Sequence, residues 1–151
     1  MKNYEIKEFD LNGKIIKIKF IKNPKRSFIA QASNFGVFGL GYISVDKLFF
    51  NFSKNEQKSM IYHELWHYKN NLKFEIEILF SKKFWIFLSQ NKLSKLQELE
   101  ADKYASIKNN KKNMIRTLKD IKILCKKGEV EYNYKNHPTL EERIKKIKEL
   151  K

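Results

Sequence analysis

The chain has 151 residues, of which 42% are hydrophobic and 14% aromatic, with only 5 glycines and 2 prolines. This composition excludes a low-complexity or disordered chain and fits a single domain over residues 1–151. The net charge of +15 comes from 32 Lys+Arg against 17 Asp+Glu, but the lysines are spread along the whole chain. Diffuse lysines favour a solvated surface over a specific nucleic-acid site.

A single cysteine, Cys125, excludes an internal disulfide and suits a reducing compartment. It lies in an apolar helical pattern, which predicts a buried thiol. The first residues lack the apolar core of a signal peptide. The sequence contains no run of about 18 apolar residues, so we expect no membrane-spanning helix. We therefore expect a soluble, cytoplasmic protein.

Residues 1–46 have mainly the pattern of β-structure. Residues 4–21 predict a hairpin, because an Asn-Gly pair supplies the positive φ angles of a tight turn and isoleucines alternate with lysines after it. A further strand is expected over 28–34. Another extended segment is expected over 37–45, where glycines could mark a bulge or a close backbone approach.

Residues 47–151 have mainly the pattern of α-helices. Ser53, with Glu56 three residues later, forms the capping box of a helix that we expect to end near Asn70. Three more helices are predicted, over 92–109, over 111–126 before Gly128, and after the capping residue Thr139. The elements together predict an α+β fold. In it, a small N-terminal sheet, made of the hairpin and an edge strand, packs on the first helix.

The segment 72–90 is apolar and aromatic, with glutamates and lysines among the apolar residues. This pattern favours a helical piece of the core or a hairpin lid. The alternative is an insert that forms a wall of a substrate site or touches a membrane surface, because Trp and Phe beside Lys suit an interface.

The most informative motif is HELWH at residues 63–67. On a helix, His63 and His67 lie one turn apart on the same face, and two imidazoles so placed can bind one zinc ion. Glu64 can then hold a water molecule and accept its proton. Such a short pattern also arises by chance, so its interpretation depends on the rest of the chain.

A catalytic zinc ion usually has three protein ligands, so one more is needed. Glu98 and Glu100 are both candidates, but residues two apart on a helix point about 200° away from each other. Asp102 lies four residues after Glu98, on the same face, where a carboxylate can accept a hydrogen bond from a ligand histidine. We therefore predict Glu98 as the third ligand and Glu100 as a surface carboxylate.

The third histidine, His137, precedes the last predicted helix, which contains Arg143. A loop histidine, or an arginine further along the helix, can donate to the oxyanion that forms when water attacks a carbonyl group. A loop histidine is more often simply exposed. In this chain, however, every histidine lies in a motif that suits the same chemistry.

Three motifs in this order, HELWH, ELEADKYA and HPTLEERI, resemble those of the gluzincin zinc metallopeptidases of the HtpX and CAAX-prenyl-protease type, over roughly residues 36–148. The best-known members are integral membrane proteins, whereas this chain looks more like the compact, soluble minigluzincins. The resemblance implies one zinc ion held by His63, His67 and Glu98, with Glu64 as the general base.

The resemblance also implies that Asp102 orients a ligand and that His137 and Arg143 assist at the transition state. In the family, an edge strand before the HExxH helix pairs with an extended peptide substrate by β-augmentation. The corresponding substrate-binding residues are Gly41, Tyr42, Ile43 and Ser44.

These observations predict a soluble zinc-dependent metalloendopeptidase that acts on a peptide or protein substrate. One alternative is an HExxH regulatory peptidase that acts on a repressor-type protein. A second is a non-catalytic, Lys-rich binding module. We expect no specific nucleic-acid partner, and peripheral membrane contact through 72–90 is a further alternative.

Overall fold

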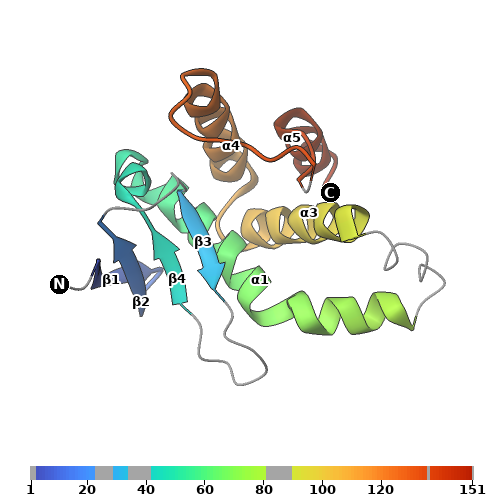
Figure 1. The fold of residues 1–151 in the computed structure, drawn as a ribbon, viewed down its shortest axis with the longest axis horizontal. Helices are drawn as coiled ribbons and strands as arrows, with labels where there is room; N and C mark the ends of the chain where they lie inside the picture. The colour runs from blue at the N-terminus through green and yellow to red at the C-terminus, as the bar shows by residue number, and fades with distance from the viewer. Residues whose placement is uncertain (1–2, 23–28, 34–41, 81–89, 136, 151) are drawn as a thin grey trace.

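The computed structural model describes residues 3–22, 29–33, 42–80, 90–135 and 137–150. A four-stranded sheet lies at one end of the molecule, the long helix α1 runs away from it, and α3, α4 and α5 form the rest of the helical part (Figure 1). The predicted α+β fold is confirmed.

The N-terminal hairpin consists of β1 (Tyr4–Leu11) and β2 (Lys14–Ile21), which pair antiparallel. The two residues between them, Asn12 (φ 56°) and Gly13 (φ 83°), both have positive φ angles. A two-residue loop with positive φ at both positions matches the right-handed twist of the flanking strands. The predicted hairpin is therefore confirmed.

The order of strands in the sheet is β1-β2-β4-β3. Strand β4 (Tyr42–Val45) pairs parallel with β2 on one side and antiparallel with β3 (Ala30–Ser33) on the other. The prediction that residues 41–44 form an edge strand is therefore wrong for 42–44, and residues 34–41 lie outside the described residues. In the described sheet, β3 lies at the edge.

The composition of the two strands gives a physical reason for this order. Ile43 (6% exposed) and Val45 (0%) of β4 point into the core, where a central strand is stabilised by burial. By contrast, β3 has the sequence AQAS, in which small and polar residues tolerate a position with one partner strand.

The main core lies between the inner face of the sheet, the 3-10 helix η2 (Lys47–Asn51) and the first half of α1. Phe9 and Phe49 pack with their ring centroids 5.8 Å apart, and Ile18 and Ile61 are buried beside them. This core fixes the N-terminal half of α1, which includes the HELWH motif, against the sheet.

Helix α1 spans Lys54–Leu79. Its predicted capping box is present, because Ser53 N–H donates to Glu56 Oε2 (2.9 Å) and Glu56 N–H donates to Ser53 Oγ (3.4 Å). The predicted end near Asn70 is wrong by nine residues. Residues 71–79 contain neither Gly nor Pro, so nothing in them stops a helix that is already formed.

The helical interpretation of the segment 72–90 is confirmed for residues 72–79, and residues 81–89 lie outside the described part. Ile76 (48% exposed) and Phe80 (83% exposed) face solvent, so these two side chains do not belong to the core. Within the described residues, no helix is both long enough and apolar enough to cross a bilayer.

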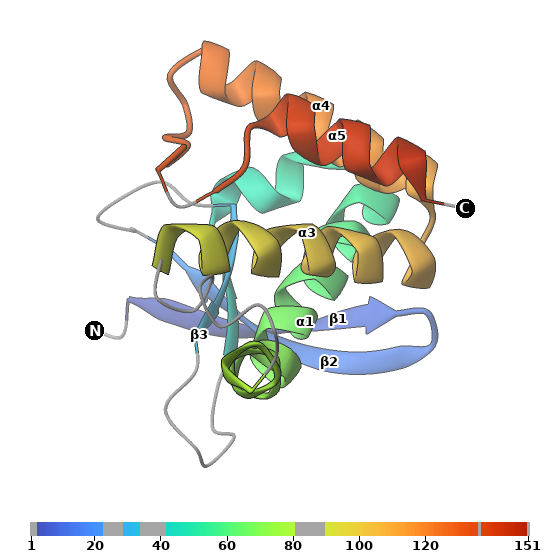
Figure 2. The same cartoon turned by 90° about the vertical axis from the view of Figure 1, so that its right-hand side faces the viewer.

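Helix α3 (Gln90–Lys108) runs back alongside α1, as the two views in Figures 1 and 2 show. Ala101 and Ala105 have no exposed surface, and their small side chains allow the close approach of the two helices. This pairing brings the middle of α3 next to the HELWH motif on α1.

Helix α4 (Lys111–Lys126) ends just before Gly128, whose φ of 72° suits glycine. Helix α5 (Leu140–Glu149) begins at Thr139, and its predicted capping box is complete. The two helices pack together over Met114, Leu118 and Ile147. The loop between them descends from α4 toward α3 before α5 begins (Figure 1).

Candidate metal centre

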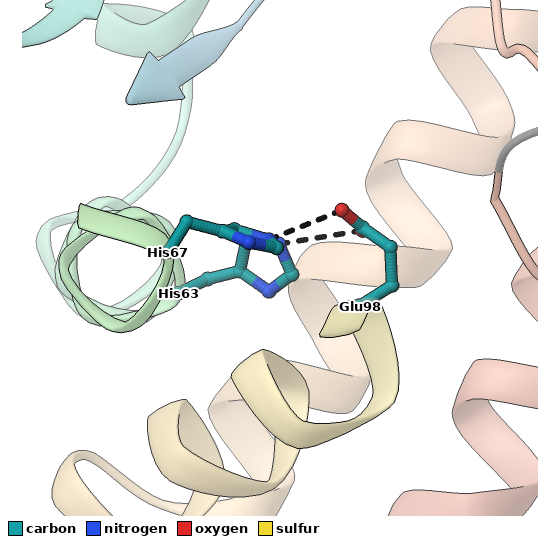
Figure 3. Close-up of side chains that lie close together, drawn as sticks. All are labelled: His63, His67 and Glu98. Atoms are coloured by element: carbon teal, nitrogen blue, oxygen red, sulfur yellow. Dashed lines mark hydrogen bonds and ion pairs between the residues drawn. The ribbon is translucent and has the colours of Figure 1, made fainter. Parts of the chain in front are cut away.

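Three side chains converge at the contact between α1 and α3. His63 and His67 project from one face of α1 toward Glu98 on α3 (Figure 3). The two Nε2 atoms of the histidines are 3.2 Å apart. Glu98 Oε2 lies 3.4 Å from His63 Nε2, and Glu98 Oε1 lies 3.1 Å from His67 Nε2.

These spacings can be compared with those of a zinc site. Ligand atoms at about 2.0–2.1 Å from a tetrahedral zinc ion lie about 3.3 Å from one another. The two imidazole nitrogens are 3.2 Å apart, and each lies 3.1 or 3.4 Å from one of the two Glu98 oxygens, so the spacings are close to this value. Two imidazole nitrogens and a carboxylate oxygen are also a ligand set that zinc accepts in hydrolytic sites. The residues therefore fit a single metal ion.

Asp102, one turn after Glu98 on α3, holds His63 from behind. Its Oδ1 lies 2.9 Å from His63 Nδ1, and the aspartate is only 1% exposed. Because an ionised carboxylate can only accept, Nδ1 carries the hydrogen and Nε2 is directed toward His67 and Glu98. The structure thus brings Asp102 to the place that the sequence predicted.

Arg143 of α5 lies under this arrangement and is buried. Its Nε and Nη2 donate to the two oxygens of Asp102 at 2.7 and 2.6 Å, and Nη1 lies 3.2 Å from Glu98. Such a two-pronged pair fixes the carboxylate in orientation as well as in charge. Arg143 therefore connects α5 to two of the residues around the metal centre.

The charges of the cluster change its ionisation strongly. Burial alone would lower the pKa of His63, but the negative charges of Glu98 and Asp102 raise it to about 10. Burial would raise the pKa of Glu98, but His63 and Arg143 hold it well below its usual range. The metal-free site at neutral pH therefore contains two carboxylates balanced by His63 and Arg143, both positively charged.

Glu64 lies next to His63 on α1, at the edge strand of the sheet. Its Oε2 accepts a hydrogen bond from the backbone N–H of Ala32 in β3, at 2.7 Å. Burial raises the pKa of the Glu64 carboxyl, although the charge of neighbouring His63 opposes this shift. A carboxyl group with a raised pKa, fixed beside a candidate metal site, is better suited to accept and return a proton than an exposed carboxylate is.

The two histidines, Glu64, Glu98 and Arg143 line one cleft, with a volume of about 1630 Å³, whereas Asp102 is not among its lining residues. One wall is formed by β3 and α1, and the other by α4 and the loop that leads to α5. Among the described residues, 29–32 line this cleft and 42–44 do not. The strand that faces the candidate metal centre is therefore β3. Cys125 lines the opposite wall and is half-buried, not buried as predicted.

His137 and Arg143, the two predicted transition-state residues, occupy different places. His137 is on the cleft wall with 38% of its side chain exposed, and its Nδ1 lies 3.2 Å from Glu98 Oε2. Arg143 contacts Asp102, Glu98 and the hydroxyl of Tyr132 with its three nitrogens. His137 is placed to meet a bound molecule, whereas Arg143 is engaged in holding other side chains.

The structure adds two groups that the motifs did not predict. One is the backbone N–H of Ala32, which no side-chain pattern can reveal. The other is Tyr132, whose hydroxyl contacts Arg143. Its position five residues before His137 was the only signal in the sequence, and tyrosines are common enough in this chain (7) for that signal to be weak.

Comparison with known proteins gives one result. A family model described as peptidase family M48 matches residues 73–151, just over half of the chain. The matched part contains Glu98, Asp102, His137 and Arg143, and it begins after the HELWH motif. Neither a curated protein nor a solved structure gives a significant match.

Proposed function

The chain belongs to peptidase family M48, and on that premise we propose that it is a zinc-dependent endopeptidase with Glu64 as its general base. The family points to a metal-dependent hydrolase of peptide bonds, in agreement with the predicted resemblance to the HtpX and CAAX-prenyl-protease type. The observation that carries the proposal is the convergence of His63, His67 and Glu98. Two of these residues lie outside the matched segment, yet the ligand atoms of all three lie within 4.8 Å of one another.

In this proposal His63, His67 and Glu98 hold one zinc ion. Bound there, zinc would lower the pKa of a water molecule and polarise the scissile carbonyl group. Glu64 then accepts a proton from the attacking water and passes it to the leaving amine. The Ala32 N–H, at 2.7 Å, keeps the Glu64 carboxylate at one place during both transfers.

We propose that His137 stabilises the oxyanion. Its ring is on the cleft wall, 3.2 Å from Glu98, so it faces the same space as the metal ligands. A donor at that place stabilises the negative charge that develops on the carbonyl oxygen. Arg143 acts indirectly in this scheme, because its nitrogens hold Asp102 and Glu98.

The substrate is proposed to bind as an extended peptide along β3. Ala32 directs its N–H into the cleft and not to β4, and backbone groups in an antiparallel strand alternate in direction. Ala30, two residues earlier, therefore directs its backbone groups to the same side. Addition of a strand at a free sheet edge is a common way to bind peptides of varied sequence.

The test is cleavage of casein or a peptide library by the purified protein and by Glu64→Gln, with metal content measured by mass spectrometry. We expect the variant to keep one zinc ion and to lose cleavage, because glutamine cannot accept the proton. Glu77→Gln makes the same change at an exposed site of the same helix (62% exposed side chain) and should leave both unchanged. Cleavage by Glu64→Gln at the wild-type rate would refute the role of Glu64.

A further inference from the structure

Tyr132 lies in the loop between α4 and α5, where its hydroxyl makes two hydrogen bonds. It accepts one from Arg143 Nη1 at 3.1 Å and donates one to the carbonyl oxygen of Pro138 at 2.7 Å. Arg143 is buried in α5, whereas Pro138 directly follows His137 in the chain. The hydroxyl therefore joins the buried arginine to the backbone next to the cleft histidine.

The ring of Tyr132 also contacts the ring of His137. The ring centroids of Tyr132 and His137 are 5.5 Å apart, and the backbone N–H of His137 donates to the carbonyl oxygen of Asn133 at 3.0 Å. Three contacts therefore hold His137 in place. They are its backbone N–H to Asn133, the Tyr132 hydroxyl to the carbonyl oxygen of Pro138, and the ring of Tyr132.

From these contacts we infer that Tyr132 is a positioning residue, whose hydroxyl fixes His137 relative to the metal ligands through Arg143. The inference rests on the proposed function for its catalytic consequence, though not for the contacts themselves. Arg143 connects to Glu98 at 3.2 Å and to Asp102 at 2.6 Å. Tyr132 therefore connects the loop to the same buried arginine that contacts Glu98 and Asp102.

A direct role of the hydroxyl in catalysis fits the geometry less well. The hydroxyl donates its hydrogen to Pro138 O and accepts a hydrogen bond from Arg143. Its only hydrogen is therefore not available to donate to a substrate. Burial raises the pKa of Tyr132, so the hydroxyl keeps its hydrogen at neutral pH. Its effect on the reaction should therefore pass through the position of His137.

The test removes one oxygen atom with Tyr132→Phe, which keeps the ring. In the peptidase assay we expect kcat to fall about five- to tenfold while KM and zinc content stay unchanged. This is less than the full value of the two hydrogen bonds that the hydroxyl makes, because their loss reaches the reaction only through the position of His137. In a His137→Ala background the same substitution should have no further effect, because a residue that acts through His137 has nothing left to position. A full additional loss in that background would overturn the inference.

The matched control is Tyr134→Phe, which removes the same atom from an exposed tyrosine two residues away (52% exposed). The ring of Tyr134 contacts that of Tyr132 in a tilted arrangement, with centroids 4.8 Å apart, so the control preserves the aromatic contact and tests the hydroxyl alone. Tyr134 also lines the cleft, so the quantity compared is kcat, which we expect Tyr134→Phe to leave at the wild-type value. An equal fall in kcat in both variants would overturn the inference, because it would indicate a general effect on the loop.

A second measurement does not depend on catalysis. The chain has 3 histidines, so a histidine-labelled sample gives a small set of ring signals by NMR, and the His137 signal is identified by its loss in His137→Ala. We expect this signal to shift or broaden in Tyr132→Phe and to stay in place in Tyr134→Phe. An unmoved signal in Tyr132→Phe would overturn the inference. A protein without peptidase activity whose His137 signal still moves would reject the proposed function and keep the positioning role.

Discussion

Asp102→Asn is the substitution whose effect the structure predicts most fully. The aspartate is 1% exposed and accepts three bonds, two from Arg143 at 2.7 and 2.6 Å and one from His63 at 2.9 Å. Asparagine has nearly the same shape, but it carries no charge and presents an N–H₂ group to at least one of these donors. The variant therefore loses charge-assisted bonds and brings two donors together in a buried place.

Two magnitudes follow from this arrangement. Loss of one partner from a buried ion pair costs about 3–5 kcal/mol, and the lower end applies here because Arg143 keeps Glu98 at 3.2 Å. For a chain of this size, about 3 kcal/mol lowers Tm by about 6–12 °C. Loss of the carboxylate behind a ligand histidine should also weaken zinc binding by about 10- to 100-fold.

The assay measures thermal unfolding of the metal-free protein and zinc affinity by competition with a chelator. Glu100→Gln is the control, because Glu100 is on the same helix with 45% of its side chain exposed, 3.9 Å from Lys103. That control should change Tm by less than about 1 °C, as surface substitutions usually do. If Asp102→Asn matched the control in both Tm and zinc affinity, the assignment of Asp102 as the residue that holds His63 and Arg143 would be wrong.

Other predictions test the remaining parts of the site. Glu98→Ala should abolish zinc binding and Glu100→Ala should not, as metal analysis of the two purified variants would show. His137→Ala should keep zinc and lower kcat by about 10²–10³-fold, the usual effect of losing an oxyanion donor, and a change in KM alone would contradict this role. In the metal-free folded protein the pKa of His63 is raised to about 10, above its ordinary value of 6.5. Protonation of His63 therefore stabilises the fold fully below pH 6.5, and this stability is lost as the pH rises through 10. Zinc binding at pH 8 should therefore release about one proton from His63, which calorimetry in buffers of different ionisation enthalpy can count. Finally, N-methylation of a substrate at alternate positions should raise KM, whereas an equal response at every position would argue against pairing with β3.

Much of the site was predictable because it depends on spacing within single helices. The four-residue interval between His63 and His67 and the equal interval between Glu98 and Asp102 put each pair on one face, whatever the rest of the fold. The caps at Ser53 and Thr139 are equally local, since each satisfies backbone groups within its own first turn. Predictions of this kind agree with the structure.

One error concerns a relation between segments, and another concerns the end of a helix. The residues of β3 and β4 are extended in both the prediction and the structure, but which strand lies at the edge depends on how β2 pairs across a long connection. Helix α1 continues past Asn70 to Leu79 because no local signal stops it.

By itself, then, the sequence determined the candidate metal ligands, the two elements that carry them and the choice of Glu98 over Glu100 as a candidate, because helical geometry is set by short-range backbone bonds. Only the tertiary structure decided that β3 faces the cleft, that Arg143 lies beneath the ligands and that the Tyr132 hydroxyl meets it. Those contacts join residues that are far apart in the chain. The packing of the helices on one another and on the sheet brings them together.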